Sequence, residues 1–276
     1  MKNSSKYLGN ELKYLKMVLN KELPKNSNSW RQSFEEEFAR RYKKKFAISL
    51  NSGTSTLHAA LVSCGVGPGD EVISPALTVI MDTSATIHSH AIPVYADINE
   101  DDFNVTPEEI EKKITKKTKA IITVSVFGQS PKMDLIKKIA DNHKIKIIED
   151  NAESMFSTYN NKIIGHYGDI SSFSFENSKH LSCGEGGITI TNDKDLAKKM
   201  RKFSNHGFIK LNSNSDSIKF KKQDLLNPSL KRHDDIGWNY RMPEFNAAIA
   251  LAQLERAEKL TKLRIQSANF FFKINS

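Results

Sequence analysis

The sequence is poor in cysteine, with only Cys64 and Cys183 among its 276 residues. Two cysteines are too few for a disulfide framework, and no cluster of histidine, cysteine and carboxylate residues has the spacing of metal ligands. No apolar run is long enough to cross a bilayer, and the first residues lack the apolar core and the cleavage site of a secretory signal. These absences predict a cytoplasmic protein without disulfides, metal or a membrane span.

Two further absences argue against particular classes of function. No G-x-G-x-x-G motif follows the first predicted strand, which argues against a dinucleotide-binding dehydrogenase. The formal net charge is +9, but the basic run 40–45 has neither an aromatic stacking platform nor a helix-turn-helix pattern beside it. Other lysines stand in pairs along predicted helices, at 112–113, 137–138 and 198–199, which is typical of solvated helix faces. The sequence therefore disfavours nucleic acid as a partner.

What the sequence does contain is an alternation of helical and extended patterns. Aromatic residues recur every four positions at Trp30, Phe34, Phe38 and Tyr42, which predicts a helix with one aromatic face against the core. Short strands are then predicted at 46–50, 71–74, 92–97, 120–126, 146–150, 171–175 and 187–192, separated by helical segments. This rhythm predicts an α/β fold with a mostly parallel sheet covered by helices. The polar segment 208–235 has no periodicity and is expected to form a long excursion.

Three of the predicted strands end in residues that can carry chemistry, and ligands of such folds bind at the carboxyl ends of strands. The segment 53–56 (GTST) would present backbone N–H groups to a phosphate, or simply cap a helix. Asp150 would keep a pyridine nitrogen protonated, or face solvent. Lys179, in SFSFENSKHLSCGEGG, is either a nucleophile that bonds to a carbonyl cofactor or a surface lysine.

The order of these motifs resembles the DegT/DnrJ/EryC1/StrS family of sugar aminotransferases, which depend on pyridoxal 5'-phosphate (PLP). The motifs run SGTSTLHAAL, GVGPGDEVI, P-x-L-T, IIEDNAE, F-S-F-x-x-S-K-x-L-x-x-G-E-G-G, SNHG and GWNYRM. The resemblance extends from about Trp30 to the last predicted helix, and the block around Lys179 is its most specific part.

The resemblance implies the aspartate aminotransferase-like (type I) fold. A large PLP-binding α/β domain with a mixed, mostly parallel sheet would span residues 1–240, with a helical segment at 1–45. Residues 241–276 would be the start of a C-terminal small domain that is truncated here. The resemblance also implies a homodimer with active sites at the subunit interface. The implied reaction transfers an amino group, usually from glutamate, to a nucleotide-linked keto-sugar for surface glycan or polysaccharide biosynthesis.

The resemblance also assigns roles to individual residues. Lys179 matches the lysine that bonds covalently to the cofactor and moves protons during catalysis. Asp150 matches the acid that pairs with the pyridine nitrogen, and Glu153 matches the residue near the ring and its hydroxyl group. The phosphate contacts implied by position are Thr54, Ser55, Ser174 and Asn239, of which Asn239 reaches the cofactor of the neighbouring subunit.

The sequence departs from the family pattern at one contact and leaves two alternatives open. Val79 stands where relatives have an aromatic residue that stacks on the cofactor ring. One branch of the family removes a sugar hydroxyl group and has histidine in place of the lysine; because Lys179 occupies that position, transamination is favoured over dehydration. The shortened C-terminus also keeps open a non-catalytic or regulatory protein with the same fold.

Overall fold

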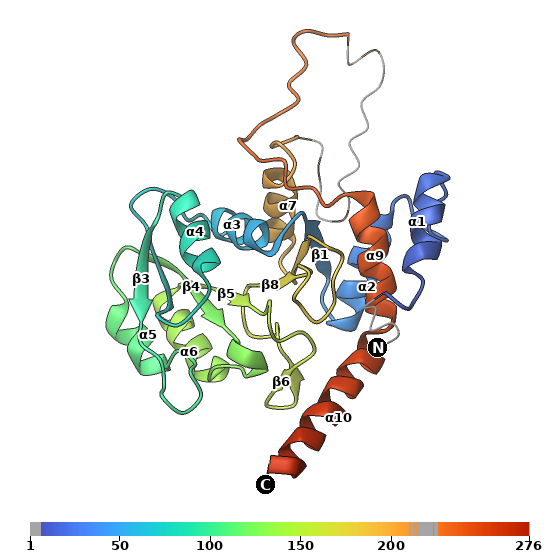
Figure 1. Cartoon of the computed structure of the whole chain (residues 1–276). Coiled ribbons are helices and arrows are strands. Elements are labelled where there is room, and N and C mark those ends of the chain that lie inside the picture. Colours follow the sequence, from blue (N-terminus) through green and yellow to red (C-terminus); the bar gives the residue numbers. More distant parts are fainter. Residues whose placement is uncertain (1–6, 210, 212–213, 215–222, 224–225, 276) are drawn as a thin grey trace.

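The computed structural model describes residues 7–209, 211, 214, 223 and 226–275. Its centre is a seven-stranded sheet in the order β1-β9-β8-β5-β4-β2-β3 (Figure 1). The strands are β1 (Phe46–Leu50), β2 (Glu71–Pro75), β3 (Ile92–Ala96), β4 (Thr118–Val124), β5 (Lys146–Asp150), β8 (Ile170–Ser174) and β9 (Gly187–Thr191). Only β9 runs against its neighbours β1 and β8, while the other pairings are parallel. The prediction of a mixed, mostly parallel sheet is confirmed.

Helices cover both faces of the sheet because the strands are apolar on both sides. One face packs against α3 (Gly53–Ser63), α4 (Ile80–His88) and α7 (Lys194–Phe203). The other face packs against α5 (Pro107–Lys113) and α6 (Met133–His143), and further along against α2 (Trp30–Arg41) and α9 (Glu244–Glu255). Neighbouring residues of a strand serve opposite faces, as Ile147 and Ile148 of β5 do.

The remaining elements lie at the margins of this layered body. A short hairpin joins β6 (Thr158–Tyr159) to β7 (Lys162–Ile163), and the single turn η1 (Val126–Gly128) follows β4. At the ends of the chain, α1 (Glu11–Leu19) packs on α9, and α10 (Ala257–Asn275) continues beyond it (Figure 1). The sequence predicted one long final helix, whereas the structure has two, separated at Arg256. None of the described helices is long and apolar enough to span a bilayer.

Two predicted segments have different outcomes. The helical segment predicted at 1–45 consists of α1 and α2, and residues 1–6 lie outside the described residues. Much of the polar segment 208–235 also lies outside the described residues; in its described part, Phe208 and His233 form an isolated antiparallel bridge. The division of the chain into domains at residue 240 stays a prediction.

The aromatic face of α2 is buried as the four-residue spacing predicts. Trp30, Phe34, Phe38 and Tyr42 are each at most 2% exposed. Phe38 stacks on Tyr42 with ring centroids 4.7 Å apart and meets Phe173 of β8 edge-on at 5.1 Å. Burial of such rings stabilises a fold by about 1.5–3 kcal/mol each. The aromatic face therefore attaches α2 to the part of the sheet that contains β8 and β9.

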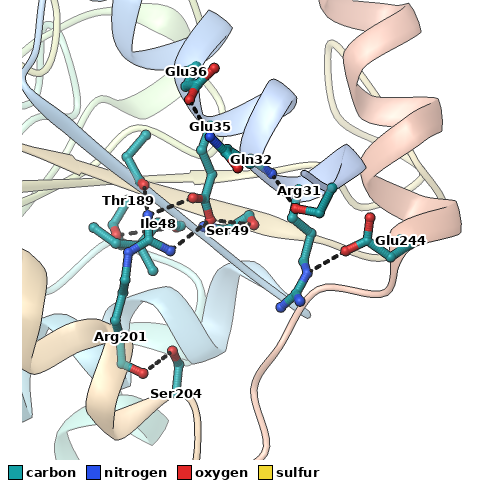
Figure 2. Close-up of polar contacts among 12 residues, drawn as sticks. Arg31, Gln32, Glu35, Glu36, Ile48, Ser49, Thr189, Arg201, Ser204 and Glu244 are labelled. Carbon is teal, nitrogen blue, oxygen red and sulfur yellow. Dashed lines mark hydrogen bonds and ion pairs between the residues drawn. The ribbon is translucent and has the colours of Figure 1, made fainter. Parts of the chain in front are cut away.

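A buried ion pair fixes the other side of α2 (Figure 2). Arg201 of α7 donates to Glu35 of α2 at 2.6 Å and to the carbonyl oxygen of Ala47 at 2.9 Å. Glu35 also accepts hydrogen bonds from the backbone N–H and the hydroxyl group of Ser49, at 2.7 and 2.8 Å. Because all of these groups are withdrawn from water, each needs its partner. The network ties α2 and α7 to β1.

We predict that Arg201→Met destabilises the protein by about 3–5 kcal/mol, because it leaves the Glu35 carboxylate buried without its cation. Urea unfolding followed by circular dichroism measures the loss. Arg40→Met is the matched control, because Arg40 bonds to Glu37 on the exposed side of the same helix and its removal should change stability little. Equal losses in the two variants would contradict the assignment.

Candidate functional site

The carboxyl ends of β1, β5 and β8 surround a cavity of about 330 Å³. Among the residues predicted from sequence, Thr54, Asp150, Ser174 and Lys179 line it. Its remaining lining residues are Ser52, Gly53 and Leu57 in and just before α3, Val79 and Met81 at the start of α4, Ala152 after β5, and Glu176, Ser178 and Glu185 between β8 and β9. The fold therefore brings together residues predicted from sequence that are up to 125 positions apart (Thr54 and Lys179).

A smaller cavity of about 220 Å³ shares part of this lining. Both cavities are bordered by Val79, Asp150, Ala152 and Lys179. Of these two cavities, Glu153 borders the smaller. The other residues around it are Leu77, Thr78, Val124, Val126 and Phe127. Its walls are thus mainly apolar, with charged groups gathered at Asp150, Glu153 and Lys179. A flat, partly polar ring is the kind of ligand that such a lining suits.

The start of α3 forms one end of the larger cavity. Ser52 is the N-cap residue, and its hydroxyl group accepts from the backbone N–H of Ser55. The Ser55 hydroxyl group donates to Asn51 Oδ1 at 2.7 Å. Gly53 and Thr54 occupy the first helical positions, where backbone N–H groups have no partner within the helix. These N–H groups and the helix dipole favour an anion at this place.

Ser55 is one of the residues predicted to contact the phosphate, but in the structure its side chain does not face the cavity. It is 3% exposed, is not among the residues that line the cavity, and completes a reciprocal capping box with Ser52. The sequence interpretation of GTST gave cap and anion site as alternatives, and at Ser55 the structure shows the cap. A phosphate contact from its side chain stays a prediction that these contacts do not support.

Ser174 lies opposite the start of α3, at the end of β8. Its hydroxyl group accepts weakly from the backbone N–H of Glu176 at 3.3 Å and borders the cavity. A Cβ atom on Gly53 would lie 2.9 Å from the Ser174 side chain, so the absence of a side chain at residue 53 lets the helix start approach the serine. Hydroxyl and N–H donors therefore converge from two elements.

The charged groups of the site are Lys179, Glu153 and Asp150. Lys179 donates through Nζ to Glu153 Oε1 at 3.2 Å. Asp150 is 3% exposed and accepts from the backbone N–H of Ala152 at 3.0 Å. Burial raises the pKa of Asp150 to about 6, although the N–H of Ala152 and the charge of Lys179 lower it. A carboxyl group so poorly solvated is stabilised as an anion by any cation that enters the cavity.

Asn239 is the predicted site residue that the structure does not bring to Lys179. It is exposed, its backbone forms a bridge with Asn205, and it lines neither cavity. Its neighbour Arg241 donates to the Asn205 side chain at 2.5 Å. Within one chain, Asn239 thus lies away from the cavity.

Sequence reasoning missed Phe127, which borders the smaller cavity and also a shallower one with Glu153 and Lys179. Its side chain is 80% exposed, and its backbone is left-handed, with φ 51° and ψ 25°. Such a conformation is costly for an aromatic residue and tends to occur where function requires it. The signal was available, because Phe127 follows the carboxyl end of β4, where the same strand-end rule that selected Asp150 applies.

The sequence was compared with known protein families. The model of the DegT/DnrJ/EryC1/StrS aminotransferase family matches residues 8–273. The chain belongs to this family. The resemblance noted from the motifs is thereby confirmed, and it places the chain among sugar aminotransferase homologues in a family that uses PLP.

Relatives from several bacteria share this similarity. The GDP-perosamine synthase of Escherichia coli O157:H7 is 36% identical over 269 residues, which cover 97% of this chain and 69% of that protein. The spore coat polysaccharide biosynthesis protein SpsC of Bacillus subtilis is 39% identical over 238 residues, which cover 86% of this chain and 59% of that protein.

Solved structures of the family have the same fold. The aminotransferase of Psychrobacter cryohalolentis superposes with a TM-score of 0.77 at 33% identity, over 89% of this chain and 61% of that one. A variant of GDP-4-keto-6-deoxymannose-3-dehydratase with bound GDP-perosamine superposes with a TM-score of 0.82 at 28% identity, over 95% and 69%. The chain thus spans about 60–70% of the length of these four relatives.

We predict that Gly187→Ala disrupts the site, because the added Cβ would lie 2.4 Å from the carbonyl oxygen of Ser52. A rotamer change cannot relieve overlap with the backbone. We therefore expect the free energy of unfolding to fall by about 1–3 kcal/mol. Thermal and urea unfolding measure it. Gly67→Ala is the control, since a Cβ there meets no atom within 4 Å; equal stability of both variants would show that the close approach is unimportant.

Proposed function

We propose that this chain carries the cofactor site of a PLP-dependent aminotransferase that transfers an amino group, from glutamate, to a keto group of a nucleotide-linked sugar. The observation that carries this proposal is the convergence of Lys179, Asp150 and the start of α3 on one cavity. A lysine, a buried acid and an anion site are the three groups that hold a pyridoxal phosphate. The conversion would serve the synthesis of a surface glycan or polysaccharide.

The residues present fit the cofactor. The N–H groups at Gly53 and Thr54, with the Ser174 hydroxyl group, would hold its phosphate. Asp150 would face the pyridine nitrogen, and burial raises the pKa of its carboxyl group to about 6, so a protonated ring nitrogen would stabilise its anionic form. Lys179 would form the covalent bond to the cofactor. When bound, PLP supplies an electron sink that stabilises negative charge on the substrate carbon.

Each residue of the site has a task that follows from its contacts. Lys179 Nζ would take a proton from the substrate carbon and return one during amino transfer, as a general base and then a general acid. Glu153 accepts from Nζ at 3.2 Å and so restrains the amine on one side of the cavity. Asp150, as an anion, would keep the ring nitrogen protonated.

Val79 stands where relatives have the ring-stacking aromatic residue, and it borders both cavities beside Asp150. We propose that its aliphatic side chain packs on the ring face instead. Leu77, Val124 and Val126 extend the same apolar wall. Aliphatic side chains would therefore shield the bound ring from water without aromatic stacking.

We further propose that the working enzyme is a homodimer and that Asn239 of one subunit serves the cavity of the other. The supporting observation is that Asn239 is exposed and lines neither cavity of its own chain. The proposed large domain, residues 1–240, would then hold the cofactor, while residues 241–276 would begin the small domain. The cytoplasmic location expected from sequence belongs to the same proposal.

Two alternatives differ from this proposal in one feature each. A sugar dehydratase of the family would have histidine in place of Lys179, and here His180 is only a neighbour. A non-catalytic or regulatory protein would not need a lysine, a buried acid and an anion site around one cavity. The similarity to the GDP-perosamine synthase of Escherichia coli O157:H7 supports a nucleotide-linked sugar as substrate.

We predict that added PLP gives the purified chain a visible absorbance band, which borohydride reduction removes, and that peptide mapping finds the label on Lys179. Lys179→Ala should lose the band and the label. The matched control Lys112→Ala alters an exposed lysine that pairs with Glu109 and should keep both. Absence of the band, or label spread over surface lysines, would overturn the cofactor site and favour the regulatory alternative.

A further inference from the structure

A second aspartate lies behind the cavity, and neither the motifs nor the proposed mechanism uses it. Asp82 occupies the first turn of α4 and is 0% exposed. Thr78, which borders the smaller cavity together with Asp150, donates its hydroxyl group to Asp82 Oδ2. Asp82 is therefore one hydrogen bond away from the wall of the site that Asp150 also forms.

The other oxygen of Asp82 is not satisfied. Oδ1 is buried and has no hydrogen-bond partner among the residues that the structure describes. A buried carboxylate without partners costs several kcal/mol, whereas a protonated carboxyl group in the same place costs much less. A buried acid that lacks donors is thus expected to keep its proton.

The charges around Asp82 favour the same state. Burial raises the pKa of Asp82 well above its ordinary value, and the nearby Asp150 raises it further, while the Thr78 hydroxyl group lowers it. The other titratable side chains on the packed elements have partners of their own: His58 of α3 with Tyr240, Tyr95 of β3 with Thr83, and Glu71 of β2 with Thr115. At the far end of α4, His88 lies by His58.

Opposing interactions also act on the ionisation of Asp150, which borders the cavity. The backbone N–H of Ala152 and the charge of Lys179 favour its ionised form, and Glu153 opposes it. Two buried acids that repel each other do not both ionise, and their protons leave in two steps that belong to the pair. Lys179 and the N–H donor act on Asp150, so Asp150 is the member that ionises first.

We propose that Asp82 is a positioning residue that stays protonated and so holds the buried carboxyl groups of Asp82 and Asp150 together at a single negative charge. Asp82 keeps the proton, and Asp150 remains the anion that faces the cavity. At high pH the proton leaves Asp82. The second negative charge then stabilises a protonated ring nitrogen in the site more strongly. This last step rests on the proposed function, whereas the protonation of Asp82 does not.

The protonation of Asp82 is measured in the cofactor-free chain by infrared spectroscopy. At about pH 8, exposed carboxyl groups are ionised because their ordinary pKa values are about 4. We expect a remaining carboxylic-acid C=O band, equivalent to about one group per chain, that disappears in Asp82→Asn. Asp101→Asn, which changes an exposed acid, should leave the band in place. No band in the unaltered chain, or a band unaffected by Asp82→Asn, would overturn the proposal.

The unaltered chain alone also tests the proposal if Asp82→Asn fails to fold. Its band should persist at about pH 8 and titrate away only at higher pH; a midpoint near the ordinary carboxyl value of about 4 would overturn the proposal.

The effect on the ring nitrogen is measured with ¹⁵N-labelled PLP by nuclear magnetic resonance. We expect Asp82→Asn to lower the pH at which the ring nitrogen loses its proton by about one unit, and Asp101→Asn to leave it unchanged. An unchanged pH in Asp82→Asn would overturn the tuning role. A chain that shows the infrared band but does not bind PLP would instead overturn the proposed function and leave the carboxyl pair standing.

Discussion

The candidate site depends on Gly187, where β9 passes between β1 and β8. Gly187 is paired with Leu50 at the end of β1 and with Ser174 at the end of β8. Its backbone lies so close to Ser52 that no side chain fits there. The approach draws the start of α3 and the end of β8 together, and these elements contribute Thr54 and Ser174 to the cavity. The segment that precedes β9 carries Lys179, so one glycine sets the spacing of the anion site and the lysine.

The adjacent acids at the end of β5, Glu149 and Asp150, have different roles, one structural and one chemical. Glu149 turns away from the cavity and accepts backbone N–H groups of Gly165 and Tyr167 at 2.8 and 3.0 Å. Asp150 turns toward the cavity, and among the described residues its side chain accepts a hydrogen bond only from the N–H of Ala152. Because successive side chains point to opposite faces, one acid stabilises a loop and the other is left with a raised pKa. A satisfied carboxylate supports the fold, and an undersatisfied one is available to a ligand.

Much of the fold could be predicted from the sequence because periodicity reports burial directly. The aromatic face of α2 and the apolar strands followed from spacing alone, and the strand-end rule located Asp150. The rule could not separate the inward Ser55 from the cavity-facing Thr54, because capping and anion binding use the same residue types. Phe127 and Asp82 were missed for different reasons: Phe127 was not tested against that rule, and Asp82 acts through Thr78, a contact that only the folded chain reveals.

The central claim is that one cavity holds the phosphate, the ring and the lysine in a fixed order. A crystal structure of the chain with PLP tests it most directly. We predict the phosphate at the N-terminus of α3 beside Ser174, the ring nitrogen within hydrogen-bond distance of Asp150, and continuous density from the cofactor to Lys179 Nζ. A phosphate bound elsewhere, or a ring nitrogen turned away from Asp150, would contradict it.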